Sequence, residues 1–231
     1  MTKTCPKAAL IILFALAWNC SPAGPSPANA MEFKVANTEN GQTVLIGTGD
    51  IVPGDAERLR AGLDSVRRDR WGLKELALSS SGGLVDEAFR MGDVIDAEGV
   101  LIFIPANASC ASACAVILFI DGKYHIVIEG GALGIHTCYH GASKMAAPEC
   151  NDRIAQNAVA HGTDYGSVEA PMEYTPAAEI IWFGSKEADC WGLSKWPPGA
   201  KTLPAIPPCV RAVIEGKPIP LLKPAPVPTG Q

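Results

Sequence analysis

The chain has 231 residues, with 19 basic and 24 acidic side chains and a formal net charge of −5. This length fits one domain of ordinary size that can bury its own core. An acidic chain lacks the basic face that phosphate binding requires, so the composition argues against nucleic acid as a partner.

The first 30 residues have the pattern of a secretory signal peptide. Lys3 and Lys7 precede the apolar run Ala8–Trp18, and small residues follow up to Ala30. This run is too short for a membrane span, which needs about 20 apolar residues. We therefore expect cleavage after Ala30 rather than an uncleaved anchor or a lipoprotein acylated at Cys20. The mature chain would be periplasmic or secreted.

From Phe33 onward, short apolar runs alternate with amphipathic stretches. The pattern predicts strands over residues 43–46, 76–78, 100–104, 125–128 and 132–136. It predicts helices over residues 54–68, from residue 84 to about 96, over 109–120 and over 176–192. Strands that alternate with helices indicate an α/β fold. Residues 141–176 have a loop-rich composition. We expect one domain over residues 31–196 and a proline-rich tail over 197–231 that continues neither a sheet nor a helix.

Six cysteines remain after the predicted cleavage, and an even number in an exported chain indicates disulfides. Six cysteines allow 15 connectivities. Pairing of neighbours predicts Cys138–Cys150, which closes a loop, and Cys190–Cys209, which tethers the tail. Cys110 and Cys114 are then left to each other.

Three local features could carry chemistry. The predicted strand 76–78 runs into a Ser-Ser-Gly-Gly turn ending at Gly83, whose backbone N–H groups could face an oxyanion. Ser112 lies where an apolar strand leads into a buried helix, a position that exposes a nucleophilic hydroxyl. His136 ends a strand and could accept the serine proton. Each feature alone also fits a purely structural role: a tight turn, a packed or capping serine, a core histidine.

The order and spacing of these features resemble the proteolytic subunit of Clp protease. Ser112 in Ala-Ser-Ala follows Gly83 by 29 residues, and His136 in Gly-Ile-His follows Ser112 by 24. Residues 45–51 and 185–193 resemble the family's early strand-turn and a later helix end. The resemblance covers residues 42–195 and implies a single-domain α/β fold, the crotonase/Clp-protease-like spiral of ββα units.

The resemblance implies a serine hydrolase acting on a peptide or a small acyl substrate. Ser112 would be the nucleophile and His136 the general base, and the N–H groups of Gly83 and Ala113 would form the oxyanion hole. The chemistry needs no cofactor and no metal. An ATP-driven unfoldase partner is not expected, because the periplasm holds no ATP. Trimers and larger rings are common in the superfamily, so a homo-oligomer stays open.

The chain departs from the family where the catalytic aspartate is expected, because residues 180–182 are Ile-Ile-Trp. Glu179 is the nearest substitute in sequence, and Asp164 and Glu173 are alternatives. Loss of the orienting carboxylate in a triad costs about 10⁴-fold in rate. The rival interpretation is therefore a catalytically degenerate Clp-like binding or scaffold protein of the cell envelope.

A second rival is a metal or thiol site. Its ligands would be side chains that Zn²⁺ accepts, namely Cys110, Cys114, His136, Cys138 and His140. Their spacing is not that of a usual zinc module, and disulfide formation would compete for the thiolates. A nucleophilic Cys114 is disfavoured, because an exported cysteine among apolar residues is more often paired or inert.

Overall fold

A computed structural model describes residues 30–201 and 206–215. The predicted signal peptide lies outside the described residues except for Ala30, so its cleavage stays a prediction. Within these ranges, no helix is long and apolar enough to cross a membrane.

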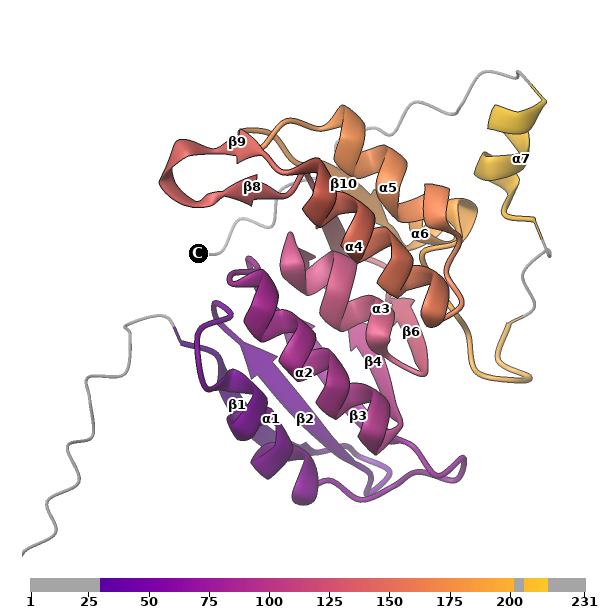
Figure 1. The fold of residues 1–231 in the computed structure, drawn as a ribbon. Coiled ribbons are helices and arrows are strands. Elements are labelled where there is room, and N and C mark those ends of the chain that lie inside the picture. The colour runs from indigo at the N-terminus through magenta and orange to yellow at the C-terminus, as the bar shows by residue number, and fades with distance from the viewer. Residues whose placement is uncertain (1–29, 202–205, 216–231) are drawn as a thin grey trace, which may run out of the picture.

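The main sheet has five strands in the order β1-β2-β3-β4-β6 (Figure 1). The strands are β1 (Glu32–Asn37), β2 (Thr43–Thr48), β3 (Lys74–Ser79), β4 (Val100–Ile104) and β6 (Tyr124–Val127). β1 pairs antiparallel with β2, and the other neighbours are parallel. The α/β class is therefore confirmed. Four of the five strands were predicted, whereas β1, a largely exposed edge strand, was not.

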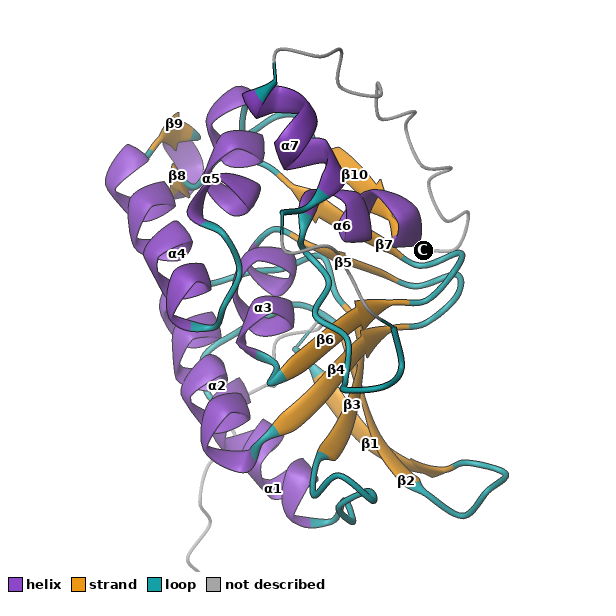
Figure 2. Cartoon of the chain, turned by 90° about the vertical axis from the view of Figure 1, so that its right-hand side faces the viewer, coloured by secondary structure: helices purple, strands orange, loops and turns teal. Residues whose placement is uncertain are grey.

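Helices cover one face of this sheet (Figure 2). α1 (Asp55–Asp64) follows β2 and α2 (Val85–Glu98) follows β3, which gives the strand–helix–strand order expected for parallel pairing. Both helices are amphipathic, with Leu59, Leu63, Met91 and Ile95 fully buried. α1 ends four residues before the predicted boundary.

A second sheet has the order β10-β7-β5. Its strands are β5 (Ser109–Ala111), β7 (Ala132–Ile135) and β10 (Ile181–Gly184). The prediction of one helix over 109–120 is wrong at its start, because residues 109–111 pair with β7 instead. A π-helical turn, η1 (Cys114–Leu118), and the short helix α3 (Phe119–Asp121) follow, with every side chain buried. The prediction of a helix over 176–192 is also wrong in part, because β10 precedes α6 (Ser185–Trp191).

The segment expected to be loop-rich contains two helices. α4 (Pro148–Ala160) begins at a proline, whose missing N–H costs nothing at a helix start, and α5 (Tyr165–Tyr174) packs against it. Before α4, β8 (Tyr139–His140), η2 (Gly141–Ser143) and β9 (Met145–Ala146) form a projecting hairpin (Figure 1). The described part of the tail contains one short helix, α7 (Pro208–Ile214), which begins at a proline as α4 does and which the sequence pattern did not predict.

The three predicted disulfides are present: Cys110–Cys114, Cys138–Cys150 and Cys190–Cys209. The last joins α6 to α7 and tethers the tail. Closing loops of these lengths stabilises a chain by about 2–3 kcal/mol each on a chain-entropy estimate. Disulfides fit a protein that works in oxidising surroundings.

Candidate active site

Ser112 lies on a sharp turn between β5 and the buried helical segment. Its backbone has φ of 54°, a left-handed conformation that non-glycine residues rarely adopt. The turn is fixed on both sides: the N–H of Ser112 donates to the Gly134 carbonyl at 2.8 Å, and the N–H of Ala115 donates to the Ser112 carbonyl at 2.9 Å. The residue is only partly buried, so the turn presents the serine while its neighbours Ala111 and Ala113 are buried.

The Ser-Ser-Gly-Gly turn lies directly beside this serine. Ser80 exchanges backbone hydrogen bonds with β5, donating to Ser109 O at 2.8 Å and accepting from the Ala111 N–H at 2.9 Å. Gly82 then packs against the serine turn so closely that a Cβ on it would lie 2.7 Å from the Ser112 Cβ. The same added atom would lie 3.1 Å from the Ala113 nitrogen. The sequence therefore needs a glycine at position 82 for the two turns to touch.

Gly83 and Ala113, the predicted oxyanion donors, have no hydrogen-bond acceptor for their N–H groups within the described part of the chain. The bonds to the neighbouring segment are made on either side of Gly83: Ile51 donates to Gly82 O at 2.7 Å, and Leu84 donates to Ile51 O at 3.0 Å. In such a parallel bridge, the N–H of the central residue points the other way. A Cβ on Gly83 would lie 2.2 Å from Ile51 O, so only glycine fits there.

His136 follows β7 directly, and its imidazole is partly buried and stacks on Tyr139 with ring centroids 5.6 Å apart. Nδ1 lies 2.7 Å from the carbonyl oxygen of Thr137. Because a carbonyl oxygen only accepts, this contact needs a proton on Nδ1 and leaves the lone pair of a neutral ring on Nε2. That is the tautomer a general base requires.

Ser112 and His136 follow the carboxyl ends of the parallel strands β5 and β7 and therefore lie at the same end of the second sheet. The N–H of Ser112 donates to the carbonyl of Gly134, two residues before the histidine. Among the described residues, Ser112 Oγ makes no hydrogen bond to the imidazole. Catalytic hydrogen bonds are often long in ligand-free enzymes and shorten when substrate binds. The role of this pair therefore stays a prediction.

The candidate orienting carboxylates make no contact with the imidazole that would fix it in the described part of the chain. Glu179, Asp164 and Glu173 are all exposed, and within the described chain none of them bonds to His136. Residues 180–182, where the family's aspartate is expected, instead present apolar groups. Trp182 pairs with Gly134 and covers it.

The cysteines of the rival metal site are occupied. All three that this site would need are disulfide-bonded, and a disulfide sulfur has no thiolate to bind zinc. Within residues 30–201 and 206–215, no group of three or more His, Cys, Asp or Glu side chains could hold a metal ion.

Sequence reasoning missed one polar residue near this site, Asn151, which is buried and binds the backbone after His136. The sequence does carry one signal for this contact. The predicted Cys138–Cys150 disulfide brings Asn151, the residue after Cys150, close to the residues that follow His136.

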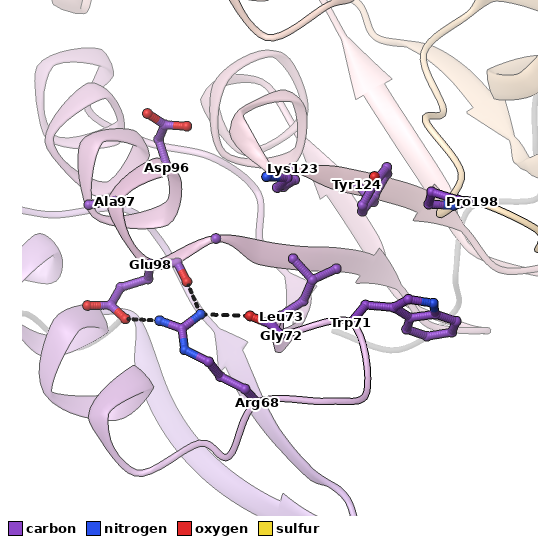
Figure 3. Close-up of a pocket in the computed structure, with 11 residues that line it drawn as sticks. Arg68, Trp71, Gly72, Leu73, Asp96, Ala97, Glu98, Lys123, Tyr124 and Pro198 are labelled. Atoms are coloured by element: carbon purple, nitrogen blue, oxygen red, sulfur yellow. Dashed lines mark hydrogen bonds and ion pairs between the residues drawn. The ribbon is translucent and has the colours of Figure 1, made fainter.

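A pocket of about 480 Å³ lies at the opposite end of the main sheet, beside the starts of β3, β4 and β6 (Figure 3). Its most prominent cation, Arg68, is already engaged: its guanidinium donates to the carbonyls of Gly72 and Glu98 at 2.9 and 2.7 Å. It also pairs with the Glu98 carboxylate at 3.3 Å. Ligands of parallel sheets bind at the carboxyl ends of the strands. Ser112 and Gly83 lie at that end, and this pocket does not.

No protein-family model matches the chain, and no curated protein matches its sequence. Among solved structures, the chain is similar to a serine-to-alanine mutant of the 1510-N membrane-bound stomatin-specific protease. The identity is 16%, the match covers 63% of this chain and 73% of that one, and the TM-score is 0.47. It is also similar to an asparagine-to-aspartate mutant of ClpP1 from Listeria monocytogenes, at 19% identity over 63% of this chain and 84% of that one, with a TM-score of 0.48. These likenesses concern the fold alone.

Proposed function

We propose that this chain is an exported serine hydrolase that cleaves peptide or small acyl substrates without ATP. Ser112 is the nucleophile, His136 the general base, and the N–H groups of Gly83 and Ala113 form the oxyanion hole. The observation that carries the proposal is the pair of unpaired backbone N–H groups beside a serine with φ of 54°. Free donors next to a strained, accessible hydroxyl are typical of acyl-transfer sites.

The acylation step follows from these placements. The Ser112 Oγ attacks the carbonyl carbon of the substrate while its proton passes to Nε2 of His136. The carbonyl oxygen becomes an oxyanion and accepts hydrogen bonds from Gly83 and Ala113, a contribution of about 3–4 kcal/mol per donor. The tetrahedral intermediate then collapses, the bond to the leaving group breaks, and the imidazolium protonates that group.

In deacylation, water takes the place of Ser112 as the nucleophile, and Ser112 becomes the leaving group. A water molecule gives a proton to Nε2 of His136 and attacks the acyl carbon on Ser112 Oγ. The same two N–H groups hold the second oxyanion. Collapse releases the acid product, and the proton returns from His136 to Ser112.

The place of action is part of the proposal. Cleavage after Ala30 would release the chain into the periplasm or the medium, and the three disulfides support oxidising surroundings. A homo-oligomer remains open, and no unfoldase partner is included.

One observation favours a second function, that of a catalytically degenerate binding or scaffold protein. The place of the expected carboxylate is taken by Ile180 and Trp182, and Ser112 Oγ makes no bond to His136 among the described residues. On this interpretation, the chain keeps the fold and binds a partner without turnover.

A fluorophosphonate probe separates the two functions, because it reacts covalently only with an activated serine. The full chain, produced in an oxidising compartment, should be labelled. Ser112→Ala should abolish labelling, and Ser65→Ala, which removes an exposed serine at the end of α1, should leave it unchanged. His136→Gln should slow labelling by about 10²–10⁴-fold. Absence of labelling in folded wild type, or labelling that survives Ser112→Ala, would reject the hydrolase.

A further inference from the structure

The hydrogen bond from His136 Nδ1 ends on a peptide group that is itself held from the other side. The Thr137 carbonyl and the Cys138 N–H belong to one peptide unit, and the Cys138 N–H donates to Oδ1 of Asn151 at 2.8 Å. We propose that Asn151 is a positioning residue that orients His136 through this peptide, in place of the missing carboxylate. The catalytic relevance of this inference rests on the proposed function, whereas the orientation itself does not.

The orientation of the Asn151 amide is fixed by its partners. The Cys138 N–H requires an acceptor, so the oxygen faces it, and Nδ2 then donates to Thr137 Oγ1 at 3.0 Å. The Asn151 and Thr137 residues are 7% and 6% exposed. Water therefore competes little for these bonds.

The backbone around this peptide is held at several points. The Thr137 N–H donates to Thr175 O at 2.8 Å. Cys138 is joined by its disulfide to Cys150, the residue before Asn151. Asn151 sits in the first turn of α4, and its own N–H donates to Ala147 O at 3.2 Å. The acceptor for His136 is therefore fixed by a helix start, a disulfide and a buried amide.

The physical effect follows from the resonance of the peptide bond. Donation by the Cys138 N–H to Asn151 shifts electron density toward the Thr137 oxygen, which makes that oxygen a better acceptor for Nδ1–H. The proton stays on Nδ1 and the lone pair stays on Nε2, facing away from Thr137. A carboxylate has the same task in a triad, where it fixes the tautomer of the imidazole.

The test measures the tautomer directly. In ¹⁵N-labelled full chain without substrate, at a pH where the ring is neutral, the imidazole nitrogens of His136 should report the Nδ1–H form; His136→Gln assigns the signals. Asn151→Ala should shift the ring toward the Nε2–H form. Asn151→Asp keeps an acceptor for the Cys138 N–H and should restore Nδ1–H. The control is Asn157→Ala, which removes a partly buried asparagine from the same helix and breaks its bond to Asp121. This variant should leave the tautomer unchanged.

An Nε2–H form in wild type would overturn the inference without any variant. An unchanged tautomer in folded Asn151→Ala would do the same. If Asn151→Ala does not fold, Thr137→Val is the second variant. It removes the acceptor of Asn151 Nδ2 and the 3.4 Å bond from Thr137 Oγ1 to the Cys138 carbonyl, but it keeps the bond from the Cys138 N–H to Asn151. It should give a partial shift, whereas no shift overturns the proposal.

Turnover is read separately. Asn151→Ala should lower kcat by between about 10-fold and 10⁴-fold with little change in KM. A tautomer that depends on Asn151 in a chain without activity would reject the hydrolase and keep the orientation. Activity in a chain whose His136 tautomer does not change in Asn151→Ala would keep the hydrolase and reject the orienting role of Asn151.

Discussion

The side chain of Ile180 lies against Gly134, two residues before His136. A Cβ added to Gly134 would fall 2.9 Å from Ile180 Cγ2. β10 and β7 pair antiparallel, and Ile181 opposite Ile135 is the pair at that end; Ile180 and His136 are the next residues beyond this pair on the two segments. Side chains alternate along a strand, which places Gly134 and His136 on the same face. Ile180 therefore lies beside Gly134 and next to the end of β7 that His136 follows, and we infer that a carboxylate at this position would reach the imidazole.

Replacing this side chain with a carboxylate should improve the site. In Ile180→Asp, an ionised oxygen near His136 would stabilise the imidazolium better than a neutral carbonyl does. We expect the fluorophosphonate labelling rate to rise by at least about tenfold, within the 10⁴-fold that a triad aspartate can contribute. Glu179→Gln should leave the rate unchanged, because Glu179 is exposed and makes no hydrogen bond to His136 in the described part of the chain. An unchanged rate in a folded Ile180→Asp would contradict the assigned place.

A methyl group at Gly82 should block the oxyanion hole. Gly82 has φ of 100°, and a Cβ there would lie 3.1 Å from the Ala113 nitrogen and 2.7 Å from the Ser112 Cβ. Gly82→Ala should therefore displace one donor and slow labelling by about 10²–10³-fold. Gly166→Ala is the matched control, because nothing lies within 4 Å of its added Cβ. If both variants are labelled at the wild-type rate, the Ala113 N–H does not serve the reaction.

The main sheet was predictable because the hydrophobic pattern of its strands can be recognised in the local sequence. β4 is an uninterrupted apolar run, and all but one of its residues are buried, so its assignment needed no tertiary information. β5 has only the sequence Ser-Cys-Ala and runs into an apolar helix, so nothing local separates the two elements. Its strand conformation comes from pairing with β7, which lies 20 or more residues further along the chain.

The candidate site was predictable to a similar degree. The spacing that joins Gly83, Ser112 and His136 could be read in the sequence, because each ends or follows a strand. Asn151 could not, because its role depends on how the start of α4 folds back onto the residues after β7. The cysteine pairing was the one sequence feature that indicated this contact.

The Cys110–Cys114 disulfide closes a short loop around Ser112, two residues to either side. Both cysteines are fully buried. Replacing both with serine should release the left-handed turn, lower the free energy of unfolding by about 2 kcal/mol on the chain-entropy estimate, and slow labelling. The paired change at Cys190 and Cys209 should cost about 3 kcal/mol and leave labelling unchanged, because that disulfide tethers α7. Denaturant unfolding and labelling rates measured side by side test this; equal labelling of the two variants would show that the turn does not need its disulfide.

Two buried groups away from the site, Asp121 and His125, should change the stability of the fold in opposite directions as the pH rises. Burial raises the pKa of Asp121 from an ordinary value of 3.8 to about 6, against the opposing effect of His161. Burial lowers the pKa of His125 from 6.5 to about 4. The His125 contribution to stability is complete above pH 6.5 and is lost as pH falls through 4. The Asp121 contribution is complete below pH 3.8 and is lost as pH rises through 6. Each difference corresponds to about 3 kcal/mol, so the two largely offset each other between pH 4 and 6.

Asp121→Asn separates these contributions, because the amide stays neutral at every pH and can still accept the bond from Asn157. The variant should be more stable than wild type at pH 7, by up to about 3 kcal/mol, and close to wild type at pH 4. Its stability should therefore fall more steeply on acidification, since of these two groups only His125 then titrates in this range. Urea unfolding at pH 4, 5, 6 and 7 measures the difference, and Asp64→Asn, at an exposed position, should run parallel to wild type. A gain in Asp121→Asn that is as large at pH 4 as at pH 7 would mean that Asp121 is not held protonated by burial, and that the pH dependence of this fold arises elsewhere.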